Sequence, residues 1–125
     1  MQRNRVSNTQ IYLDCRRLLD MLLDATPDFP RSYKFSIGSR MHDIAISMLL
    51  KASAAYAARS KDSRLERLDS FQADFEVLKT LVRVAGERKW IRGLSRHADI
   101  VERMDAIHKQ SCAWRSSLIK GTAGQ

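Results

Sequence analysis

Three histidines are the residues of this sequence best suited to metal or acid–base chemistry. One of them, His108, follows Asp105 by three residues, which places both side chains on one face of a helix. Helical bundles that bind two metal ions use a carboxylate and a histidine at this spacing, but they need two such pairs and further glutamates. Neither Glu76 nor Glu102 is followed by a histidine three residues later. We therefore expect no metal site.

Motifs of common enzymes are also missing from the sequence. It contains no G-x-S-x-G, no H-E-x-x-H and no glycine-rich loop that could cradle a phosphate. We therefore expect a protein that is not an enzyme, with no catalytic residue and no cofactor.

Two cysteines, Cys15 and Cys112, could lie at one level of an antiparallel helical bundle. We expect both to be buried, small apolar side chains, because a reducing cytoplasm disfavours disulfides. Whether they ever pair stays open.

Positive charge is the strongest functional signal. The 125 residues include 22 Lys and Arg against 14 Asp and Glu, a net charge of +8 that is spread along the chain. Arginine predominates, and its guanidinium binds phosphate with two hydrogen bonds and stacks on bases. We expect nucleic acid as the partner. RNA or DNA, and any sequence preference, stay open.

The candidate contacts are cations that recur at helical spacing. Arg92, Arg96 and Arg103 follow one another at intervals of four and seven residues and form one stripe. Ordinary pairing within a helix, worth about 0.3–0.5 kcal/mol, is the alternative, since Asp99 lies between Arg96 and Arg103. The candidate nucleic-acid contacts are Arg16, Arg17, Arg40, Lys51, Lys79, Arg83, Arg88, Lys89, Arg92, Arg96 and Arg103.

The segment 88–92 places an indole among cations, which is the composition of a base-stacking site. The apolar pair Trp90 and Ile91 fits better as a plug that closes one end of a helical bundle. We prefer that interpretation of Trp90.

Four segments carry apolar residues at the 3.6-residue helical period. The predicted helices span residues 9–25, 33–59, 64–88 and 95–119, and residues 1–7 and 120–125 are expected to be flexible. Pro27 and Pro30 end the first helix. The expected N-caps are Ser32, then Asp62 or Ser63, and Ser95. We predict an all-α, up-down-up-down antiparallel four-helix bundle that forms a single domain over residues 1–125.

Apolar stripes define the expected core. The first stripe includes Leu22 and Leu23, and the last includes Ala98, Val101 and Met104. The Ala-rich stretch 52–58 fits either an interface between subunits or close packing inside the bundle. Tyr56 and Trp114 lie on core-facing stripes and are expected to serve packing or subunit contact.

No apolar run approaches the roughly 18 residues of a membrane span. The N-terminus also lacks the apolar stretch of a signal peptide. We therefore expect a cytoplasmic protein with no membrane partner.

The segment 29–41, FPRSYKFSIGSRM, resembles the opening of the second helix in the Avd-like four-helix bundle family. Avd is the accessory variability determinant of diversity-generating retroelements. The resemblance continues through residues 65–69 and 78–85 to Trp114-x-x-Ser117. Related bundle proteins encoded in intervening sequences of bacterial rRNA genes usually carry S-I-P-x-N-I-A-E-G, where this chain has SMLLKASAA at 47–55.

The resemblance implies a ring-shaped homopentamer with a basic surface. Such a protein would bind the retroelement's reverse transcriptase and its template RNA or cDNA, and would support mutagenic reverse transcription and retrohoming. The family has no catalytic residue to transfer to this chain. The alternative is a non-catalytic interaction bundle of the rRNA intervening-sequence type that docks an acidic protein.

Overall fold

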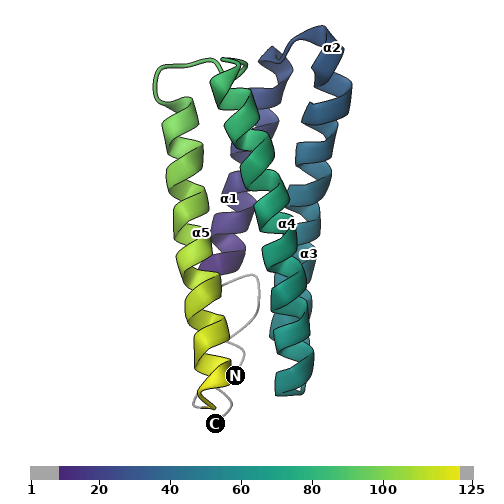
Figure 1. Ribbon diagram of the computed structural model, residues 1–125, viewed down its shortest axis with the longest axis vertical. Coiled ribbons are helices and arrows are strands. Elements are labelled where there is room, and N and C mark those ends of the chain that lie inside the picture. Colours follow the sequence, from purple (N-terminus) through teal and green to yellow (C-terminus); the bar gives the residue numbers. More distant parts are fainter. Residues whose placement is uncertain (1–8, 122–125) are drawn as a thin grey trace.

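The computed structural model describes residues 9–121, and every regular element in that range is helical (Figure 1). Four long helices lie along its long axis: α1 (Gln10–Ala25), α3 (Ser39–Ala57), α4 (Lys61–Glu87) and α5 (Arg96–Ile119). Helices α1 and α4 each pack against both α3 and α5. The chain reverses direction between consecutive long helices (Figure 1), which confirms the predicted antiparallel bundle. No helix in the described range is long and apolar enough to cross a membrane.

The predicted second helix is divided into three parts. After a short 3₁₀ turn, η3 (Thr26–Asp28), the chain enters α2 (Arg31–Tyr33), a π-helical segment η4 (Lys34–Gly38) and then α3. The predicted start of this helix, at residue 33, is wrong by two residues, because Pro30 and not Ser32 occupies the N-cap. Proline is favourable there because it has no backbone N–H to leave unpaired.

The last two predicted helices are undivided, and their boundaries differ from the prediction by at most three residues. Helix α4 begins three residues earlier than predicted, because the Ser60 hydroxyl accepts from the backbone N–H of Ser63 at 3.0 Å. Asp62 and Ser63 are therefore not its N-cap. Ser95 is the residue before α5, as predicted, but its side chain does not cap the helix. The expected flexible residues 1–7 and 122–125 lie outside the described range, and Lys120 still donates its backbone N–H to the carbonyl of Ser116.

The core runs the length of the bundle between the four helices. Ala52 and Ala55 are buried in it, so the Ala-rich stretch of α3 serves close internal packing there. The fully buried large side chains include Leu18, Leu22, Met41, Met48, Leu68, Phe71, Phe75, Leu78, Ile100, Ile107 and Leu118.

Three predicted core positions are wrong. Leu23 is 46% exposed, Val101 is 38% exposed and Ala98 is also exposed, whereas Ile100 is fully buried. Successive residues of a helix are rotated by about 100°. A residue next to a buried position can therefore match the apolar pattern and still face solvent.

A buried carboxylate connects α1 to α5. Asp14 is 4% exposed. Its Oδ1 accepts from Arg103 Nη1 at 2.7 Å and from Gln10 Nε2 at 3.1 Å, and its Oδ2 accepts from Gln110 Nε2 at 2.6 Å. These contacts compensate the cost of removing the charge from water.

Replacing Asp14 tests that connection. Asp14→Ala is expected to lower the free energy of unfolding by about 2 kcal/mol, because Gln110 and the half-buried Arg103 lose their acceptor. Asp20→Ala, at an exposed position of the same helix, is the control and should change stability by less than about 0.5 kcal/mol. Urea denaturation measures both, and equal effects of the two substitutions would contradict the structural role of Asp14.

Candidate nucleic-acid interface

The three histidines lie in two different surroundings. His42 Nε2 lies 2.7 Å from the hydroxyl of Thr26. His97 and His108 line a groove of about 350 Å³ between α4 and α5. The ring of His108 stacks on Phe75, with 5.2 Å between centroids. Within residues 9–121, no three His, Cys, Asp or Glu side chains lie close enough together to hold a metal ion.

The two cysteines have opposite environments. Cys15 is buried in the core, and desolvation, with a smaller contribution from the charge of Asp14, raises the pKa of its thiol to about 12. Cys112 is exposed, so the expectation that both thiols are buried is wrong for this residue. The inward position of α5 is taken by Ser111, and Cys112 lies one residue further around the helix. Neither cysteine forms a disulfide.

Two of the candidate cations, Lys51 and Arg103, are held in ion pairs between helices. Lys51 Nζ lies 2.9 Å from Asp74 Oδ2, and Arg103 is bound to Asp14. Asp74 also accepts a hydrogen bond from Ser47 at 2.6 Å, so Lys51 is part of the α3–α4 contact.

Two more candidates have looser partners. Lys79 Nζ lies 3.7 Å from Glu76 on the same helix. Arg96 donates to the carbonyl of Asp24 at 3.0 Å and lies 3.8 Å from Asp28. Asp99 was the expected partner of Arg96 and Arg103, and both instead pair with carboxylates outside α5. The expected stripe of three arginines thus has Arg92 alone outside an ion pair.

Seven candidates form no ion pair within the described part of the chain, and the structure does not bring all of them together. Their positions are on α1, at the start of α3, on the wall of the α4–α5 groove, and in or next to the α4–α5 connection. They are Arg16, Arg17, Arg40, Arg83, Arg88, Lys89 and Arg92.

The α4–α5 connection is shaped by the end of α4. Lys89 has a left-handed backbone, with φ of 63°. Its N–H donates to the carbonyl of Gly86 at 3.0 Å, and the N–H of Trp90 donates to that of Ala85 at 2.9 Å. This pair of bonds is the Schellman motif, which commonly carries an apolar residue at the position of Trp90. The turn directs the indole back over the end of the bundle.

Trp90 joins two segments that are far apart in the sequence. Its ring stacks on Tyr33 with 4.7 Å between centroids and an interplanar angle of 21°, and it packs at a tilt on Phe29 at 5.4 Å. Trp90 and Ile91 are 8% and 9% exposed, which confirms that they close this end of the bundle. The guanidinium of Arg88 lies 6.0 Å from the Tyr33 ring and 5.7 Å from the Trp90 ring.

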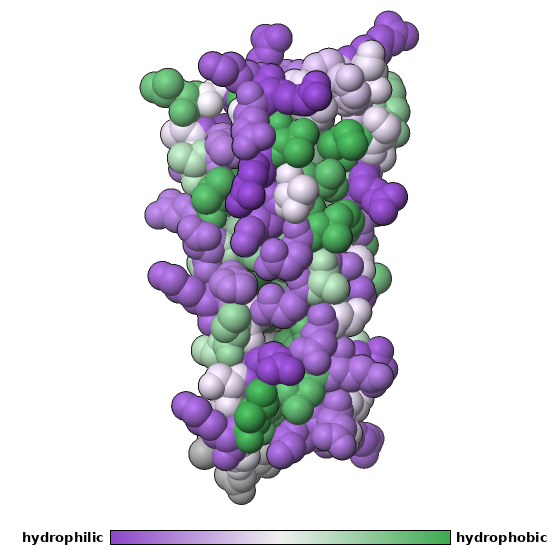
Figure 2. All heavy atoms as spheres, viewed as in Figure 1, coloured by the Kyte–Doolittle hydropathy of each residue, from purple (hydrophilic) through white to green (hydrophobic). Residues whose placement is uncertain are grey.

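The stacking of Tyr33 on Trp90 brings α2 beside the α4–α5 connection and adds two cations that the sequence analysis missed, Arg31 and Lys34. They flank Tyr33 in the chain, but nothing local places them beside residue 90. We call the resulting group the cationic end: Arg31, Lys34, Arg88, Lys89 and Arg92. In Figure 2, strongly hydrophilic side chains lie at this end, the upper one in the view of Figure 1, as they do along much of the same face.

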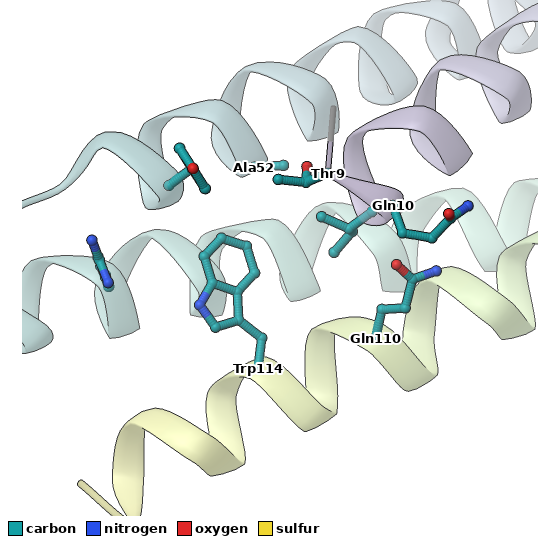
Figure 3. A pocket seen from close by; sticks show the side chains of 8 residues that line it. Thr9, Gln10, Ala52, Gln110 and Trp114 are labelled. Carbon is teal, nitrogen blue, oxygen red and sulfur yellow. The ribbon is translucent and has the colours of Figure 1, made fainter. Parts of the chain in front are cut away.

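Cations without an ion pair also lie at the opposite end. The pocket near that end is lined by only one cation that could bind an anion. It has a volume of about 520 Å³ and lies where α1 begins, with Trp114 on one wall (Figure 3). Its one arginine, Arg64, donates Nε to the carbonyl of Ala58 at 2.8 Å. Tyr56 and Trp114 are half-buried, and Trp114 packs on the core, as expected.

The fold and its surface define the class: an all-α four-helix bundle of strongly basic composition, with cations gathered beside an aromatic stack. The family model described as bAvd-like matches residues 5–118, so the chain belongs to the bAvd-like family. This confirms the resemblance based on residues 29–41. No curated protein matches the chain.

The two thiols should differ sharply in reactivity. At pH 8, iodoacetamide is expected to modify Cys112 and leave Cys15 intact, because the thiolate is the nucleophile and a thiol with a pKa of about 12 stays protonated and buried. Mass spectrometry should find one added group on the native protein and two after denaturation. Cys112→Ser, as control, should take up none in the native state. Rapid double modification of the folded wild type would contradict the burial of Cys15.

Proposed function

We propose that this protein is a nucleic-acid-binding accessory protein of a diversity-generating retroelement. It binds the retroelement's reverse transcriptase and its template RNA or cDNA, and it supports mutagenic reverse transcription and retrohoming. It takes part by binding, without a catalytic residue or cofactor of its own. Membership of the bAvd-like family supports the retroelement role.

The observation that carries nucleic-acid binding is the cationic end. Its five cations form no ion pair with any described residue, so their charge is available to an external anion. Asp28, a neighbouring carboxylate, is offset by Arg96. Cations that contact phosphates release condensed counterions, so affinity falls as salt rises, with a slope that counts the contacts.

Several copies in a ring would strengthen weak binding by each copy. A ring-shaped homopentamer would present five cationic ends to one polynucleotide, and once one end has bound, the others bind at high effective concentration. The exposed apolar side chains of the long helices, such as Ile46, Leu50 and Val77, are compatible with contacts between copies.

Removing charge from the cationic end tests the binding. The triple variant Arg31→Gln/Lys89→Gly/Arg92→Gln should lose about tenfold to a hundredfold in affinity for RNA at 0.1 M salt, and the slope of log K against log[salt] should fall by about 2–3. Lys89→Gly removes the charge and suits the left-handed backbone, so it does not weaken the fold. Filter binding across a salt series measures both quantities.

The control removes the same charge at the opposite end of the bundle. Arg59→Gln/Lys61→Gln/Arg67→Gln changes three exposed cations that form no ion pair within residues 9–121, and it should lower affinity less than about threefold. Equal losses in both variants would show that net charge, and not the cationic end, governs binding. A protein that binds an acidic polypeptide but no polynucleotide would support the interaction-bundle alternative.

Assembly with the enzyme is tested by co-expression. The protein and the reverse transcriptase of its retroelement are expected to co-purify as a complex that contains five copies of the 14.3 kDa chain. Light scattering and native mass spectrometry give the copy number. A monomer at micromolar concentration, or a failure to retain the enzyme, would contradict this part of the proposal.

A further inference from the structure

Two exposed aromatic rings lie at the cationic end. Tyr33 is 39% exposed and Phe35 is 76% exposed. They are the only exposed aromatic side chains among residues 9–121. The other large exposed apolar side chains, such as Leu50 and Leu94, are aliphatic. Aromatic surface and cations without an ion pair therefore coincide at this one place in the described structure.

Tyr33 is held in a fixed position. Its ring stacks on the buried ring of Trp90. Its backbone N–H and that of Lys34 both donate to the carbonyl of Pro30, at 2.9 Å each. A ring that is fixed before binding loses little conformational entropy when a ligand stacks on it. Tyr33 can thus act as a preformed platform.

Cations surround both rings. Arg31 and Lys34 are neighbours of Tyr33 in the chain, and Lys34 Nζ lies 5.9 Å from the centroid of the Phe35 ring. Arg88 lies beside Tyr33 and Trp90. Proteins that hold single-stranded nucleic acid combine aromatic platforms for the bases with cations along the backbone. A partner protein with an aliphatic contact surface would gain no binding energy from the cations around the two aromatic rings.

We propose that the cationic end is a binding site for single-stranded nucleic acid, in which unpaired bases stack on Tyr33 and Phe35 while adjacent phosphates contact Arg31, Lys34, Lys89 and Arg92. This inference rests on the proposed function and adds a preference for unpaired over duplex strands. The faces of bases inside a duplex are covered by their neighbours, so a duplex can use the cations but not the rings. Stacking is also tolerant of base identity.

The test removes the aromatic rings and keeps the charge. Tyr33→Leu/Phe35→Leu is expected to bind an oligouridylate of 20 nucleotides about tenfold more weakly than the wild type, and an RNA duplex of 20 base pairs within about threefold. The salt slope should not change, because no cation is lost. An oligonucleotide that contains 2-aminopurine should lose fluorescence on binding the wild type and keep it with the variant.

Two further variants separate stacking from folding. Tyr33→Phe/Phe35→Tyr keeps both rings and should restore wild-type affinity for the oligouridylate. Phe35→Leu alone changes a side chain that is 76% exposed, so it should leave thermal unfolding unchanged and still weaken single-strand binding. Leu94→Ala, at an exposed aliphatic position in the α4–α5 connection, is the matched control and should bind as the wild type does.

Each outcome decides between the two proposals. Equal losses for single strand and duplex, or no recovery with the aromatic swap, would overturn stacking. Loss of binding in the charge variant with none in Tyr33→Leu/Phe35→Leu would leave the proposed function standing and remove the inference. If the wild type binds no polynucleotide, the proposed function itself fails. If Tyr33→Leu/Phe35→Leu loses the binding of a protein partner but binds nucleic acid as the wild type does, the rings belong to a protein contact and the stacking proposal is overturned.

Discussion

The packing of the Trp90 ring against Phe29 and Tyr33 is the contact on which the arrangement of the cationic end depends. It closes the core at the end where α4 stops, and it holds the segment before α3 against the α4–α5 connection. Both segments carry cations on their outer side. One aromatic contact thus completes the hydrophobic core and sets the arrangement of charge on the surface.

Carboxylates decide which cations remain available. Asp14 and Asp74 engage Arg103 and Lys51 across helix contacts, where both charges are partly removed from water. Such pairs are poor sites for an external anion, because binding would have to break them and leave a partly buried carboxylate without its partner. The net charge of +8 therefore does not show which cations can bind a polyanion, because some of them are held in ion pairs.

The periodicity of apolar residues was sufficient to predict four antiparallel helices, because that pattern depends only on which side of each helix avoids water. Ends of helices were less predictable. The N-cap at Ser60, the start at Arg31 and the π-helical residues 34–38 depend on local hydrogen bonds for which several neighbouring residues compete. Within a helix, Val101 was also predicted wrongly. It is apolar and lies next to the buried Ile100, so the apolar pattern alone does not show which of the two residues faces the core.

The all-α class, the basic character and the family could be predicted from the sequence, because they depend on composition, helical period and local motif. It also indicated that Trp90 closes the bundle. The fold was needed to find that Arg31 and Lys34 join Arg88, Lys89 and Arg92, and that Tyr33 and Phe35 stay exposed beside them. Tyr33 and Trp90 are more than fifty residues apart in the chain, and no local preference encodes a contact over that separation.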